Sequence, residues 1–134
     1  MDIAQVLNSM KQIIIVNSAL ELPEEKRAIQ MARASAGAFL EADKDARKTW
    51  LQEGKPQVVL DACDEQDLRD LLSKARRRSL PICLVENASD QAASDAQAFA
   101  CLGIGPASDF QIDQLTEVFN YYRWLRENVS NQRF

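Results

Sequence analysis

The sequence contains no histidine among its 134 residues. This absence excludes hydrolases that activate a serine or a cysteine with an imidazole base. It also excludes zinc sites with histidine ligands and a histidine-based pH switch near neutrality. Any chemistry of this chain therefore relies on lysine, arginine, aspartate, glutamate, serine, threonine or cysteine.

Cysteine is scarce, and the three present (Cys63, Cys83 and Cys101) form no Cys-x-x-Cys pair. Cys83 and Cys101 lie in apolar runs, which indicates reduced, buried thiols in an intracellular protein. The sequence shows no recognisable signal peptide and no apolar run long enough to cross a membrane, so we expect a cytoplasmic protein. The dense acids of residues 61–70 are explained by helix capping, and we expect no metal and no cofactor.

Positive charge is also in deficit, because 16 basic residues face 20 acidic ones and give a net charge of −4. An acidic domain argues mildly against a strong polyanionic partner, since nucleic-acid binders gain affinity from lysine and arginine. Residues 1–55 are neutral, however, and a basic patch there is one alternative surface for RNA. Its members are Lys26, Arg27, Arg33, Lys44, Arg47 and Lys48.

Hydrophobic and β-branched runs predict four short strands. They cover residues 11–16, 57–60, 82–85 and 98–104. Capping residues and helical spacing predict helices that begin at Pro23, near residue 43, at Asp64 and at Ser108. In the first of these helices, we expect the apolar residues at helical spacing to face the core. They are Ile29, Ala32, Ala36, Phe39 and Leu40.

The order β-α-α-β-α-β-β-α predicts an α/β fold. We expect a three-layer sandwich in which a small four-stranded mixed sheet carries helices on both faces. The last two strands have no helix between them and are expected to pair antiparallel, and Gly105 and Pro106 are expected to end the fourth strand. The expected organisation is an N-terminal arm (1–10), one domain (11–127) and a polar tail (128–134).

Several segments, in order and at nearly constant spacing, carry a resemblance to one known family. They are KQIIIV (11–16), EKRAIQMARASAGAF (25–39), WLQEGKPQVVL (50–60), DEQDLRDLLSKA (64–75), LPICLVENA (80–88) and LGIGPAS (102–108). The chain resembles the type 2 peptidyl-tRNA hydrolases of archaea and eukaryotes over about residues 11–120. The resemblance implies hydrolysis of the ester between a peptide and the 3′ ribose of tRNA, with tRNA or peptidyl-tRNA as the partner.

That family uses a lysine, a histidine, an aspartate and a threonine from its first helix and from the loop that leads into the fourth strand. Position by position, Lys26 matches the lysine and Gln30 a neighbouring glutamine, whereas Arg33 stands at the histidine position and Asn87 at the aspartate position. The resemblance implies that Lys26 and Asn87 are catalytic and that Gln30 and Arg33 bind substrate.

The hydroxyl-bearing part of the family pattern is replaced here. Its Gly-Arg-Thr becomes Ser89-Asp90-Gln91, and its Gly-Thr-Arg-Thr becomes residues 97–100, QAFA. Two functions therefore stay open: a hydrolase with a diverged site, and a non-catalytic member of the fold that binds a protein or itself. A homodimer is expected in either case, and aromatic residues of the last helix offer an interface. They are Tyr121, Tyr122 and Trp124.

Overall fold

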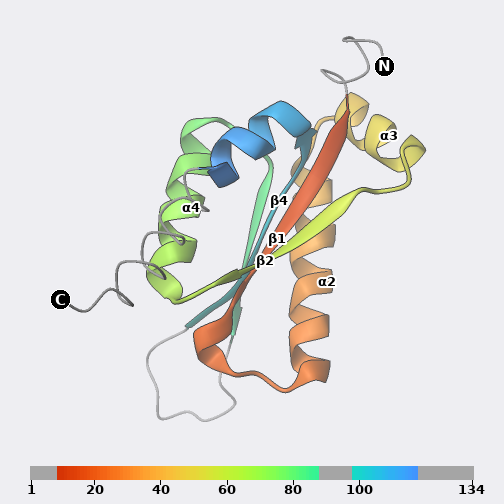
Figure 1. Cartoon of the computed structure of the whole chain (residues 1–134). Coiled ribbons are helices and arrows are strands. Elements are labelled where there is room, and N and C mark those ends of the chain that lie inside the picture. Colours follow the sequence, from red (N-terminus) through yellow and green to blue (C-terminus); the bar gives the residue numbers. More distant parts are fainter. Residues whose placement is uncertain (1–8, 88–97, 118–134) are drawn as a thin grey trace, which may run out of the picture.

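Four strands form one mixed sheet in the order β2-β1-β4-β3 in the computed structural model, which describes residues 9–87 and 98–117 (Figure 1). The strands are β1 (Met10–Asn17), β2 (Gln57–Ala62), β3 (Ile82–Asn87) and β4 (Ala98–Ser108). β1 and β2 pair parallel, and β4 pairs antiparallel with both β1 and β3. The mixed sheet and the antiparallel pairing of the last two strands are thereby confirmed.

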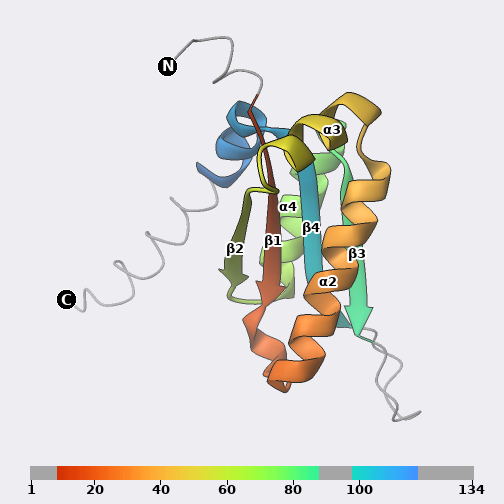
Figure 2. The same cartoon turned by 90° about the vertical axis from the view of Figure 1, so that its right-hand side faces the viewer.

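Helices cover both faces of this sheet (Figures 1 and 2). A short 3₁₀ helix, η1 (Ser18–Leu20), leads from β1 towards α2 (Glu24–Glu41), which is followed by α3 (Lys44–Gln52). α4 (Glu65–Arg77) packs on the opposite face, together with the helical residues 109–117. This arrangement is the predicted three-layer sandwich.

Side chains that accept backbone hydrogen bonds define where three of the helices begin. Asp43 Oδ1 accepts from the N–H of Ala46, and Asp64 Oδ1 accepts from the N–H of Asp67. Ser108 Oγ accepts from the backbone N–H of Gln111, as the predicted capping box requires. Pro23 is the N-cap residue of α2, and the helix itself begins at Glu24.

The alternation of side chains along β1 divides the core into two clusters. Ile13 and Ile15 point to the α4 face, and Ile14 and Val16 to the α2 face. The α4-side cluster is completed by large side chains from α4, β4 and residues 109–117. They include Leu68, Leu71, Leu102, Ile104, Ile112 and Leu115, all at most 1% exposed. The α2-side cluster is built mainly from smaller residues such as Ala34, Ala100 and Cys101.

The prediction that Gly105 and Pro106 end the fourth strand is wrong. β4 continues through this dipeptide to Ser108, which pairs with Met10. The register between β1 and β4 shifts between Lys11 and Ile13, opposite the dipeptide. A proline lacks the N–H that a regular ladder requires, and an irregularity in the ladder accommodates it.

The predicted inward face of α2 is also wrong. Ile29 is 53% exposed and Leu40 is 69% exposed, whereas Ala34 and Ala38 are completely buried. Small residues face the sheet because the helix backbone lies almost against β4: a Cβ on Gly103 would be only 2.3 Å from the carbonyl oxygen of Ala34. The larger apolar side chains are thereby excluded from the interface.

A buried polar network fixes α2 against the sheet. Gln12 of β1 has no exposed surface, and its Nε2 donates to the backbone oxygens of Ser35 and Gly105, each at 3.0 Å. Its Oε1 accepts from Ser35 Oγ at 2.6 Å and from Gln57 Nε2 at 2.8 Å. The amide of Gln12 is thereby fully hydrogen-bonded, which offsets the cost of burying it.

The three cysteines are free thiols in different environments, so we expect them to react with a thiol reagent in a fixed order. Cys63 is exposed, Cys83 is half-buried, and Cys101 is buried with its pKa raised by desolvation to about 12. Burial also raises the pKa of Cys83. Since the thiolate is the reactive form, one equivalent should react rapidly in the native protein and all three only after unfolding. Peptide mapping after a timed alkylation checks this order, and rapid labelling of Cys101 would contradict it.

Candidate functional site

One edge of the sheet gathers the carboxyl ends of three strands. β1 and β2 run parallel, and β3 shares their direction because both β1 and β3 are antiparallel to β4. The chain leaves β1 at this edge through η1, and α2 begins there and runs back along the sheet (Figure 1). In open α/β folds, ligands bind in the crevice beyond such strand ends.

Three of the four predicted site residues lie on one flank of α2. Lys26, Gln30 and Arg33 are spaced i, i+4 and i+7, which places them above one another on a helix. Gly37, four residues further on, continues the same row. A Cβ on Gly37 would be 2.2 Å from Cys83 Sγ, and that sulfur lies 3.8 Å from the carbonyl oxygen of Arg33. The flank therefore borders β3 (Figure 2).

The fourth predicted residue, Asn87, lies at the end of β3, on the same face of the sheet. Cys83 and Val85 pack in the α2-side cluster, and Asn87 follows them in the strand alternation. From Cys83 to Asn87 the strand advances about 13 Å. From Arg33 back to Lys26 the helix covers about 10 Å in the same direction. Lys26 and Asn87 are therefore brought to nearly the same level at this edge.

The cations of this flank are exposed and have no carboxylate partner within the described ranges, 9–87 and 98–117. Neither Lys26 nor Arg33 is in an ion pair there. Gln30 presents a buried Oε1 that likewise accepts no hydrogen bond from any residue described by the structure. Two exposed positive charges without an ion-pair partner among the described residues form a surface suited to a phosphate-containing ligand.

Other predicted features are not brought to this edge. Lys44, Arg47 and Lys48 belong to α3, at the opposite end of the sheet, so the proposed basic patch is divided in two. Residues 89–91 and 97, which replace the family's hydroxyl-bearing segments, lie outside the described residues. The same holds for the aromatic residues of the last helix and for most of the N-terminal arm.

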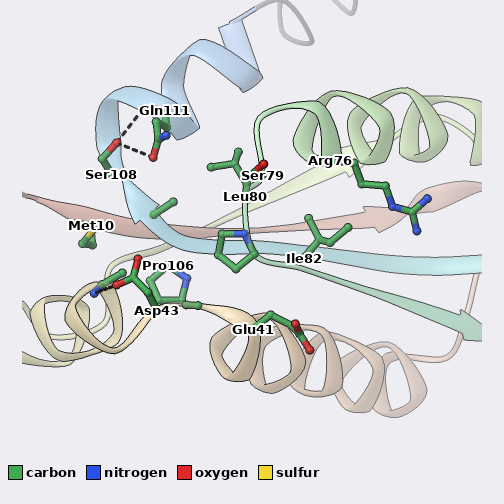
Figure 3. Close-up of a pocket in the computed structure, with 14 residues that line it drawn as sticks. Met10, Glu41, Asp43, Arg76, Ser79, Leu80, Ile82, Pro106, Ser108 and Gln111 are labelled. Atoms are coloured by element: carbon green, nitrogen blue, oxygen red, sulfur yellow. Dashed lines mark hydrogen bonds between the residues drawn. The ribbon is translucent and has the colours of Figure 1, made fainter.

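A cavity of about 590 Å³ lies at the end of the sheet opposite Lys26 and Asn87 (Figure 3). Its polar lining includes Asp43, Ser108 and Gln111, and these side chains form the helix caps described above. Glu41 and Arg76 add one charge of each sign to the wall. None of the four predicted site residues contributes to this cavity, so it is a separate feature of the fold.

Within the described residues, no group of three or more cysteine, aspartate or glutamate side chains is placed to hold a metal ion. Of the helices described, none combines the length and the apolar character required to cross a membrane.

Comparison with known proteins matches the sequence of this chain to a family. The profile of the family described as peptidyl-tRNA hydrolase PTH2 covers residues 10–122. The chain belongs to the PTH2 family. A protein named peptidyl-tRNA hydrolase from Methanopyrus kandleri is 41% identical over 108 residues, 79% of this chain and 92% of the relative. Proteins of the same name from Halobacterium salinarum and Haloquadratum walsbyi are 34% and 32% identical and are covered over 95% and 100% of their length.

This membership confirms the resemblance on which the four site residues depend. The structure adds contacts at the same edge that sequence reasoning missed, made by Asn17 and Glu65 to the backbone of Phe99. Glu65 lies among acids that the sequence explains by helix capping alone. No local pattern reveals its partner, because the contact spans 34 residues.

Proposed function

We propose that this protein hydrolyses the ester bond between the peptide and the 3′ ribose of peptidyl-tRNA, with the strand-end edge as its active site. The observation that carries the proposal is the alignment of Lys26, Gln30 and Arg33 on the α2 flank beside β3, level with Asn87. Membership of a family whose relatives bear the name peptidyl-tRNA hydrolase supports the same reaction.

In the proposed reaction, water adds to the ester carbonyl and the bond to the 3′ oxygen breaks. The water's proton passes to that oxygen, which leaves as the ribose hydroxyl. The ammonium group of Lys26 stabilises the negative charge that develops on the carbonyl oxygen. Asn87 donates and accepts hydrogen bonds but takes up no proton, so its role is to orient the attacking water or the neighbouring 2′-hydroxyl.

Arg33 and Gln30 bind the tRNA end in this proposal. A guanidinium stays charged at every physiological pH and matches a phosphate with two parallel hydrogen bonds. Arg33 therefore replaces the family's histidine as a phosphate-binding group and not as a proton carrier. The Oε1 of Gln30 is buried, so we assign the amide nitrogen of its side chain as a donor to a ribose hydroxyl.

Release of the blocked amino acid from N-acetyl-aminoacyl-tRNA by the purified protein tests the proposal. We expect deacylation well above the buffer rate, measured as loss of acid-precipitable label. Unblocked aminoacyl-tRNA is the matched control for the requirement of a blocked amino group. A rate indistinguishable from that of buffer would refute the proposed function.

Two finer expectations accompany this function. Peptidyl-tRNA arises in translation, so we assign the activity to the cytoplasm, and assembly as a homodimer stays a prediction. The alternative of a non-catalytic interaction domain gains no support, because relatives matched over 92% and 100% of their own length bear the hydrolase name. The aromatic residues that favoured it lie outside the described part of the chain.

A further inference from the structure

The peptide groups of Phe99, the second residue of β4, are held by side chains from two other elements. The Phe99 N–H donates to Oε1 of Glu65, at the start of α4, at 3.0 Å. The Phe99 carbonyl oxygen accepts from Nδ2 of Asn17, the last residue of β1, at 2.8 Å. Asn17 is only 4% exposed, and its own Oδ1 accepts from the N–H of Ala19 in η1. Both backbone groups of one residue are therefore fixed by groups far away in the sequence.

A third side chain, Arg69, completes this arrangement. Its guanidinium carbon lies 4.4 Å from the centroid of the Phe99 ring, and its Nη2 lies 3.3 Å from Oε2 of Glu65. The hydrogen bond from the Phe99 N–H lowers the pKa of Glu65, which keeps the carboxylate ionised. We call Asn17, Glu65 and Arg69 the Phe99 clamp.

The clamp acts at the point where the regular ladder between β3 and β4 changes register. Val85 pairs with Cys101, but Glu86 pairs with Phe99, so Ala100 is the extra residue of a bulge. The next pair joins Asn87 to Ala98. A bulge leaves an unpaired residue and a local bend, so this last pair is weakly defined by the ladder alone. The side chains that hydrogen-bond to the backbone of Phe99 instead fix the position of this last pair.

Three elements meet in the clamp, and two of them, β1 and β4, adjoin the elements that carry the candidate site residues. Asn17 leads into η1 and α2, which carries Lys26, while Phe99 is adjacent to Ala98, the partner of Asn87. α4 contributes the carboxylate from the opposite face of the sheet. The clamp therefore ties β4, the strand that pairs with Asn87, to β1, the strand that leads into the helix bearing Lys26.

We propose that Glu65 and Asn17 are positioning residues for ester hydrolysis: by holding the N–H and the carbonyl oxygen of Phe99, they fix Asn87 relative to Lys26. This inference rests on the function proposed above. Neither residue needs to touch the substrate. A displacement of a catalytic group by about 1 Å can cost about 100-fold in rate, so a loosened Asn87 should lower kcat.

Glu65 is the residue to vary, because its side chain is 38% exposed and its replacement leaves no buried gap. We expect Glu65→Ala to lower kcat about 10-fold with KM changed less than about twofold, since a positioning defect acts in the transition state. Glu65→Gln keeps an oxygen acceptor for the Phe99 N–H and should restore most of kcat. Gln66→Ala is the matched control: it removes another side-chain hydrogen bond of the same helix turn, to Asp70, and should leave kcat unchanged.

Amide hydrogen exchange gives a second readout that does not depend on activity. Exchange of the Phe99 N–H should accelerate in Glu65→Ala and stay slow in Glu65→Gln. An active wild-type enzyme whose Glu65→Ala variant retains its kcat would overturn the positioning role and leave the proposed function intact. Unchanged protection of Phe99 in Glu65→Ala would equally overturn it. An inactive wild-type protein would refute the proposed function itself.

Discussion

Replacing Lys26 with alanine should lower kcat/KM for N-acetyl-aminoacyl-tRNA about 100- to 1,000-fold, the effect of losing one donor to a developing oxyanion. Lys26 is exposed, lies in the first turn of α2 and has no ion-pair partner within the described residues, so its removal breaks no ion pair there. The loss should therefore appear in turnover and not in thermal stability. Single-turnover deacylation measures the loss of turnover, and a thermal melt of each variant measures its stability.

Lys48→Ala is the matched control, because Lys48 is also an exposed helix lysine but lies on α3 at the other end of the sheet. It should retain wild-type turnover. Arg33→Ala should behave differently again, raising KM with a smaller change in kcat, since Arg33 is assigned to phosphate binding. Turnover by Lys26→Ala within a few-fold of wild type would remove Lys26 from the mechanism.

The layered fold follows from local patterns that the structure confirms. β-Branched runs marked β1, and the spacing of Leu68, Leu71 and Leu72 after the Asp64 cap marked α4 and its buried face. The same residues determine both the element and its burial in these two cases. Such agreement between local propensity and tertiary packing makes an element readable from sequence alone.

The errors occur where tertiary contacts override local preference. On α2, the apolar Ile29 and Leu40 suggested the wrong face, because a close backbone approach selects Ala34 and Gly37 at the interface. At Pro106, a shift in the register between β1 and β4 allows β4 to continue. Neither cause is visible within a window of the sequence, since each depends on a segment brought close by the sheet.

The candidate site was predictable only in part, and for a related reason. The helical row of Lys26, Gln30 and Arg33 is readable from spacing, but its relation to Asn87 depends on strand order and direction. The Phe99 clamp was not predictable at all, because Asn17, Glu65 and Phe99 come from three separate elements. The family resemblance indicates which residues form the candidate site. The strand order and direction of the sheet place them at the same edge.

Gly103→Ala is expected to destabilise the protein by about 3 kcal/mol, at the upper end of the usual cost of overpacking. The added Cβ would lie 2.3 Å from the carbonyl oxygen and 2.7 Å from the carbonyl carbon of Ala34. These are backbone atoms, so no rotamer change relieves the clash, and α2 itself has to move away from β4. For a chain of this length the melting temperature should fall by about 12 °C.

Gly37→Ala provides the informative comparison, because its obstacle is a side chain. The new Cβ would lie 2.2 Å from Sγ and 2.8 Å from Cβ of Cys83, and Cys83→Gly removes both atoms. A double-mutant cycle should therefore show favourable coupling between Gly37→Ala and Cys83→Gly.

Gly103→Ala should show no such rescue by Ala34→Gly, since the obstructing backbone remains. Chemical denaturation of the variants measures the coupling free energy in both pairs of substitutions. A Gly103→Ala protein as stable as wild type would show that α2 does not lie this close to β4. Since α2 also carries Lys26, a displaced helix should lower turnover as well, so the contact between Ala34 and Gly103 links the stability of the fold to the geometry of its strand-end edge.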